Sequence, residues 1–79
     1  MAFHIKIQKT AETPAKVQYA FESALQGRGV LELDKQSGEA RLVEAMPQDE
    51  RLHCYQRAVV KVTREWKAGR LPQTLEWAS

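Results

Sequence analysis

The sequence predicts an α+β fold in which a four-stranded antiparallel sheet carries two helices on one face, as a two-layer sandwich. Two patterns lead to this fold class. Apolar residues recur every three or four positions in two stretches, which is typical of amphipathic helices. Short runs elsewhere alternate apolar and polar residues, which is typical of half-buried strands. The resulting order, β-α-β-β-α-β, is that of the ferredoxin-like split βαβ arrangement, and right-handed crossovers would place the strands in the order 4-1-3-2.

Four short runs have strand character and are predicted to form the sheet: residues 3–8, 30–34, 40–46 and 71–78. Gly38 follows the second of these strands and is expected to adopt a positive φ in the turn. Pro72 has no backbone N–H, so the last strand is expected at an edge of the sheet. If that strand did not pair, a three-stranded sheet with two helices would remain.

The first helix is predicted over residues 14–25. Thr13 is a suitable N-cap, and Pro14 suits the first helical position, where its missing N–H costs nothing. Gly27 and Gly29 are expected to end the helix, because glycine tolerates the left-handed conformation. The apolar side chains of the predicted buried face are Val17, Phe21, Ala24 and Leu25.

The second helix is predicted from Asp49 to Ala68, with acids in its first turn and Gly69 closing it. Arg57, Lys61 and Arg64 are expected on the face opposite its apolar stripe. The residues of that stripe are Leu52, Tyr55, Val59, Val62 and Trp66. Together with inward residues of the other elements they form the predicted core: Phe3, Ile5, Ile7, Val17, Phe21, Leu25, Leu31, Leu33, Leu42, Leu52, Tyr55, Val59, Val62 and Trp66. The uncovered sheet face is expected to carry His4, Lys6, Glu32, Arg41 and Glu76.

Composition places the chain among small globular proteins. Residues 1–79 are expected to form one domain, since 43% apolar and 28% charged residues argue against disorder. The single cysteine, Cys54, cannot form a disulfide within the chain. No run approaches the roughly 20 apolar residues of a membrane span, and the first residues lack the apolar segment of a signal peptide. A cytoplasmic protein without membrane contact is expected.

No constellation of residues predicts catalysis, a cofactor or a metal, so the chain is not expected to be an enzyme. His53 and Cys54 are adjacent on a helix, and their side chains would point about 100° apart, which prevents them from sharing one ion. Cys54 is expected to be a dispensable residue on the flank of the apolar stripe, partly buried. The predicted central strands lack the aromatic side chains on which RNA-binding sheets stack bases. No phosphate-binding loop is present.

The charge is unevenly distributed, and this asymmetry predicts an interaction surface. Residues 51–70 contain six bases and one acid, although the net charge is only +2. Such a face is often merely solvated, but it also suits an anionic partner. Tyr19 and Trp77 are expected to be accessible aromatic residues, which are enriched at interfaces. The candidate interaction residues are Arg57, Lys61, Arg64, Lys67 and Trp77.

Two functions follow as hypotheses. The first is a non-enzymatic protein–protein interaction module, either binding an unknown partner or forming a homodimer. The dimer contact is expected through the edge strand near Leu75 and Trp77 or through the end of the second helix, where it overhangs the sheet. The second is weak, sequence-nonspecific nucleic-acid binding, in which the basic helix face contacts phosphates.

Overall fold

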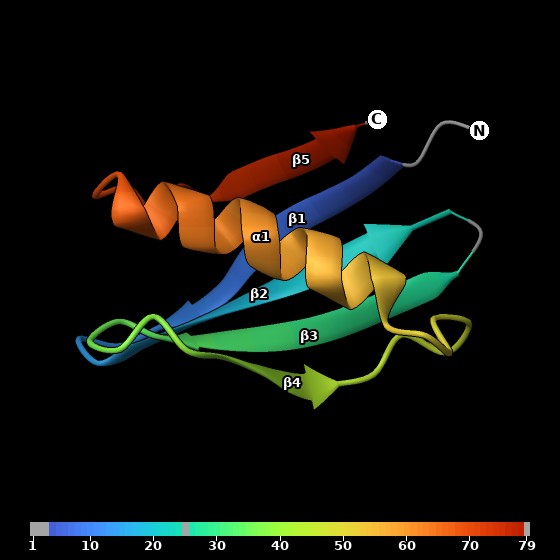
Figure 1. The fold of residues 1–79 in the computed structure, drawn as a ribbon, viewed down its shortest axis with the longest axis horizontal. Coiled ribbons are helices and arrows are strands. Elements are labelled where there is room, and N and C mark those ends of the chain that lie inside the picture. Colours follow the sequence, from blue (N-terminus) through green and yellow to red (C-terminus); the bar gives the residue numbers. More distant parts are fainter. Residues whose placement is uncertain (1–3, 25, 79) are drawn as a thin grey trace.

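The computed structural model describes residues 4–24 and 26–78, which form one antiparallel sheet with a helix across one face (Figure 1). The order of elements along the chain is β1 (His4–Glu12), β2 (Lys16–Ser23), β3 (Gly27–Asp34), β4 (Ala40–Glu44), α1 (His53–Lys67) and β5 (Thr74–Ala78). The five strands lie in the order β4-β3-β2-β1-β5. The first four strands therefore form a meander, and β5 returns after the helix to pair with β1. No helix among these residues is long and apolar enough to cross a membrane.

The predicted fold class is wrong, because residues 14–25 do not form a helix. Residues 16–23 are strand β2, so the four-stranded sheet with two helices and the strand order 4-1-3-2 are replaced by a five-stranded sheet with one described helix. The three-stranded alternative is wrong for the same reason. Val17 and Phe21 are four residues apart, a spacing that suits both a helix and a strand. Tyr19 distinguishes the two: Val17, Tyr19 and Phe21 are all fully buried on one face of the sheet, which is the period of two of a strand.

The residues predicted to cap a helix form the β1–β2 turn instead. The N–H of Thr13 donates to the carbonyl of Lys16 at 2.8 Å, and the N–H of Lys16 donates to Thr13 Oγ1 at 3.0 Å. Pro14 occupies the second position of this turn, where its fixed φ is favoured. The same local chemistry that suits a helix start therefore also suits a tight turn.

Gly29 does not end a helix but lies inside β3, opposite Phe21 of β2. A Cβ atom at this position would lie 2.4 Å from Cζ of the Phe21 ring. Glycine is therefore required because the aromatic ring lies directly over the backbone. The prediction for Gly38 is confirmed: its φ is +78° in the β3–β4 turn, where the ring of Trp66 packs against it.

The predicted edge position of the last strand is confirmed, and so is the strand character of the three other predicted runs. The long helix is present but begins at His53 rather than at Asp49. Asp49 is nearly fully buried and accepts hydrogen bonds from the backbone N–H groups of Cys54 and Tyr55, each at 3.0 Å. It therefore caps the helix from the preceding loop, which reaches the helix through Leu52 in the left-handed conformation, at a φ of 58°.

The core lies between α1 and the helix-facing side of the sheet. Seven predicted core residues are fully buried: Ile5, Ile7, Val17, Phe21, Leu31, Leu33 and Val62. Five others are only half-buried: Leu42, Leu52, Tyr55, Val59 and Trp66. Phe3 and Leu25 lie outside the described residues. The centre of the helix face is Cys54, Ala58 and Val62, so the predicted stripe is displaced to one side of the true buried face.

The prediction that Tyr19 is accessible is wrong. Its ring is completely buried, and its hydroxyl donates to the carbonyl of Pro72 at 2.6 Å. Burial raises the pKa of Tyr19 to about 12, with further contributions from the charges of Glu12 and Glu65. This hydrogen bond connects the centre of the sheet to the loop that leads into β5.

Candidate interaction surface beside strand β5

The outer edge of β5 presents backbone groups that no other described strand pairs with. The Lys9 N–H donates to the Gln73 carbonyl at 2.8 Å, which makes this a hydrogen-bonded pair in the β1–β5 ladder. Backbone direction alternates along an antiparallel strand, so the groups of Leu75 and Trp77 point toward β1 and those of Thr74 and Glu76 point away. Two N–H and two C=O groups at alternate residues are thus available at this edge.

The predicted basic residues lie beside that edge rather than opposite the buried face of α1. On one flank of the helix, the ring centroids of Tyr55 and Phe21 are 6.0 Å apart, and Trp66 Nε1 donates to the Lys35 carbonyl at 3.0 Å. That flank therefore faces β2 and the β3–β4 turn. The opposite flank, which faces β5, carries Arg57, Lys61 and Arg64, and we call these three residues the cation flank.

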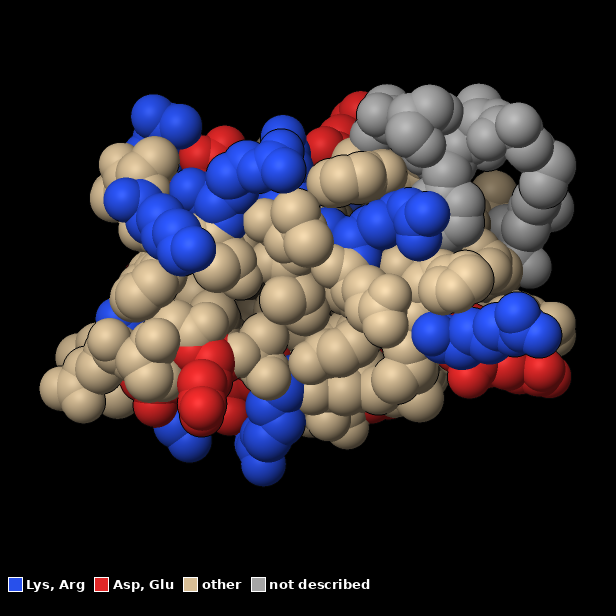
Figure 2. Space-filling model, viewed as in Figure 1, with Lys and Arg blue, Asp and Glu red and all other residues tan. Residues whose placement is uncertain are grey.

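Figure 2 shows Lys and Arg side chains gathered along the β5 side of the helix. Arg57 and Lys61 are half-buried, whereas Arg64 and Lys67 are exposed. Among the strands, β5 packs most extensively against α1, so the cation flank lies on the side of the helix that faces this strand. The side of the helix farthest from the sheet instead carries Val60, which is 42% exposed.

The charged side chains on this side of α1 differ in whether they have partners within the protein. Arg57 donates to the His53 carbonyl at 3.3 Å. Glu65 is the only acid among residues 51–70, and Arg70 holds it through Nε and Nη2, each 3.0 Å from its carboxylate oxygen. Lys61, Arg64 and Lys67 form no ion pair with another described residue. The local acid is therefore already neutralised, and these three cations retain their charge for an external anion.

Trp77 lies on the helix-facing side of β5, opposite Ile5 of β1, and is half-buried. Its indole Nε1 is buried and has no hydrogen-bond partner within the described part of the chain. An unsatisfied buried N–H costs about 1–3 kcal/mol, so it is rare in folded proteins and requires an explanation. Trp77 was expected at this surface, but its unpaired N–H is visible only in the structure.

The far side of the sheet carries the five polar residues predicted for it. His4 Nε2 lies 3.1 Å from Glu76 Oε2, and Glu32 pairs with Arg41 at 3.1 Å. A hydrogen bond from Gln18 and the nearby charges of Lys16 and Arg41 lower the pKa of Glu32. Charges on this face are thus largely balanced.

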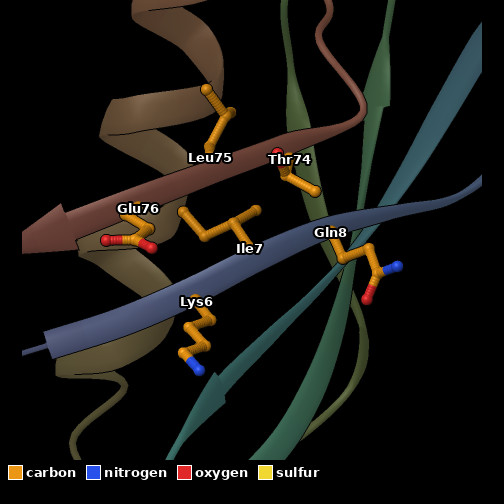
Figure 3. Close-up of a pocket in the computed structure, with 6 residues that line it drawn as sticks. All are labelled: Lys6, Ile7, Gln8, Thr74, Leu75 and Glu76. Atoms are coloured by element: carbon orange, nitrogen blue, oxygen red, sulfur yellow. The ribbon is translucent and has the colours of Figure 1, made fainter.

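A shallow depression lies along β1 and β5, and Lys6 and Gln8 of β1 and Thr74 and Glu76 of β5 surround it (Figure 3). Lys6 and Glu76 are cross-strand partners of opposite charge. Because nothing in this depression concentrates one sign of charge, it is a weaker candidate than the cation flank.

Cys54 is more deeply placed than predicted. It is fully buried, and its thiol donates to Gln26 Oε1 at 3.1 Å. Burial raises the pKa of the Cys54 thiol to about 11, and the Asp49 carboxylate contributes in the same direction. The neighbouring His53 is exposed, so the two side chains do point apart. Among residues 4–24 and 26–78, no group of three or more His, Cys, Asp or Glu side chains could hold a metal ion.

Comparisons of the chain with protein-family models, with curated proteins and with solved structures find no match.

Proposed function

We propose that this protein is a protein–protein interaction module whose partner docks at the outer edge of β5. The observation that carries this proposal is the outer backbone of Thr74 and Glu76, which pairs with no other described strand, on the side of the sheet toward which the cation flank faces. Unpaired strand edges are templates for the addition of a further strand, which supplies main-chain hydrogen bonds to the complex.

A second copy of this chain fits the edge less well than a different partner. Pairing of β5 with its own copy about a twofold axis would place both helices on the same face of one continuous sheet. The two cation flanks would then approach each other, and like charges would oppose the contact. The charge beside β5 therefore favours a heterologous partner of opposite sign.

Proline scanning of the two sheet edges tests this proposal. Thr74→Pro removes an outward N–H at the first residue of β5, where proline is compatible with an edge strand. Ala40→Pro is the matched control, because Ala40 is the first residue of β4 and its N–H points outward from the opposite edge. Both variants, checked for folding by circular dichroism, would serve as bait beside the unchanged protein in affinity capture from nuclease-treated extract of the source cell.

The expected result is that a specific set of proteins is lost with Thr74→Pro and retained with Ala40→Pro. Equal loss with both variants would point to altered stability instead. Equal retention with both would place the partner elsewhere and would contradict the proposal.

A second candidate function is weak nucleic-acid binding through the same helix, favoured because Lys61, Arg64 and Lys67 form no ion pair with another residue that the structure describes. About three phosphate contacts would give a slope of log affinity against log salt near −3, with little sequence preference. Joint reversal of Arg57, Lys61 and Arg64 to glutamate should then abolish retention of DNA or RNA at low salt. Retention that is indifferent to this triple change would exclude the second candidate.

A further inference from the structure

We infer that the segment docking at β5 is an extended acidic strand whose carboxylates occupy alternate positions, on the helix side of the enlarged sheet. This inference rests on the proposed function and adds the chemistry of the partner. Residues directly opposite each other on neighbouring strands share a face. Partner residues opposite Leu75 and Trp77 would therefore lie beneath the cation flank, and those opposite Thr74 and Glu76 would lie on the other face.

The spacing of the cations agrees with that of a strand. Lys61 and Arg64 are three residues apart on α1, a rise of about 4.5 Å along the helix. Alternate residues of a strand are about 6.6 Å apart, which is within reach of two flexible side chains. A partner with acids at positions i and i+2 could thus pair with both cations at once, and Arg57 lies one turn further along the same flank.

The other face of the strand selects against acids. Glu76 points to the uncovered side of the sheet, where it pairs with His4, so a carboxylate opposite Glu76 would meet a like charge. Neutral or basic residues are preferred there. The cation flank on the helix side and Glu76 on the uncovered side therefore favour a strand with acids at alternate positions over a segment that is acidic throughout.

The same features favour a peptide over a nucleic acid. The cations border an edge that offers two N–H donors and two C=O acceptors at alternate residues, which complements a peptide backbone. A phosphate backbone has no N–H donors to satisfy those carbonyl groups.

Two blocked heptapeptides of identical composition test the inference. Thr-Thr-Glu-Thr-Glu-Thr-Thr places both glutamates on one face of a strand, and Thr-Glu-Thr-Thr-Glu-Thr-Thr places them on opposite faces. Each peptide would be titrated into isotopically labelled protein, with the amide signals of Thr74 and Glu76 followed by nuclear magnetic resonance. The first peptide should bind about three- to fivefold more tightly, the gain expected from one additional exposed ion pair.

Charge reversal supplies the matched control. The double variant Lys61→Glu with Arg64→Glu should remove the preference for the first peptide. The double variant Arg28→Glu with Arg51→Glu makes the same change in net charge at exposed positions away from β5 and should retain the preference. Circular dichroism would confirm that both variants are folded.

Each alternative outcome has a distinct meaning. If both peptides shift Thr74 and Glu76 equally, strand addition stands and the acidic pattern is wrong. If neither peptide binds at millimolar concentration, the inference is overturned, while the capture experiment with Thr74→Pro still decides the proposed function. Single-stranded oligothymidine provides the last comparison. If it displaces the peptide, and if the double variant Lys61→Glu with Arg64→Glu binds it more weakly than the unchanged protein does, the surface binds nucleic acid instead.

Discussion

Glu12 illustrates how one side chain can join distant parts of this small protein. Its carboxylate accepts from Lys9 and Lys35, each at 2.6 Å. Lys35 also donates to the Thr13 carbonyl, and Lys9 donates to the Leu71 carbonyl, each at 2.7 Å. The hydrogen bond from Lys35, followed by that from Lys9, lowers the pKa of Glu12 to about 2. The end of β1, the β3–β4 turn and the loop before β5 therefore meet at this carboxylate.

The stabilising effect of Glu12 should depend on pH. Because folding lowers its pKa from 4.5 to about 2, its contribution is present above pH 4.5 and is lost as the pH falls toward 2. Glu12→Gln should therefore lower the urea midpoint at pH 6, and the difference from the unchanged protein should shrink between pH 4.5 and 2. Glu39→Gln is a suitable control, since Glu39 is exposed and forms no ion pair with another described residue. A constant difference across this pH range would contradict the account.

Cys54 should be chemically inert in the folded protein. The thiolate is the reactive species, and burial keeps the pKa of this thiol near 11. Alkylation by iodoacetamide at pH 8, followed by mass spectrometry, should be slow in buffer and fast in denaturing urea. Cys54→Ser should leave the circular dichroism spectrum unchanged. Rapid native-state alkylation would show that the thiol is accessible and would reopen the question of thiol chemistry.

At the scale of the secondary-structure elements, the sequence predicts four strands and one helix correctly and mistakes one strand for a helix. Residues 16–23 carry apolar side chains at spacings that suit both periods, and the preceding Thr13 and Pro14 suit both a cap and a turn. Residues 16–23 form a strand because they pair with β1 and β3. Such contacts between distant segments cannot be recognised from the neighbouring sequence alone. The displaced face of α1 has a related cause: Ala58 and Cys54 are small, so the larger residues beside them dominate the apolar pattern.

The corrected face of α1 can be tested by a pair of identical substitutions. Val62 is 1% exposed and Val60 is 42% exposed. Val62→Ala should lower the free energy of unfolding by about 1–3 kcal/mol through lost burial and a residual cavity. Val60→Ala should change it by less than about 0.5 kcal/mol. Similar losses in urea denaturation would show that the helix face is wrongly assigned.

The start of α1 depends on a residue outside the helix. Asp49→Ala would leave the backbone N–H groups of Cys54 and Tyr55 without their acceptor, at a cost of about 1–2 kcal/mol. Glu50→Ala, at the exposed neighbouring position, should have little effect on the urea midpoint. If the two variants were equally stable, the cap would contribute nothing.

At the scale of the whole molecule, the candidate surface could be predicted only in part. The excess of bases in residues 51–70 and the edge position of the last strand are both visible in the sequence. Their juxtaposition is not visible, because it depends on how α1 is rotated and on β5 pairing with β1 across nearly the whole length of the chain. That the indole N–H of Trp77 has no hydrogen-bond partner among the described residues likewise follows from packing alone.

The charge argument predicts that the isolated protein does not pair with itself. Sedimentation equilibrium at high protein concentration should give the chain mass of 9.0 kDa at low and moderate salt. Raising the salt concentration screens the repulsion between two cation flanks. If a dimer formed under these conditions, it would point to self-pairing through β5. In that case Trp77→Ala should weaken the association more than Lys6→Ala, because Lys6 lies on the uncovered face of the sheet.

The late return of β5 has a consequence for synthesis on the ribosome. Hairpins such as β1–β2 and β2–β3 form within about 1–10 μs, so the meander can assemble as soon as it emerges. At about 5–20 residues per second, translation of residues 45–78 takes roughly 2–7 s longer. Throughout that time β1, an interior strand of the finished sheet, is itself an open edge. Lys9 places a charge on this temporary edge, which discourages pairing between nascent chains until β5 arrives and covers it.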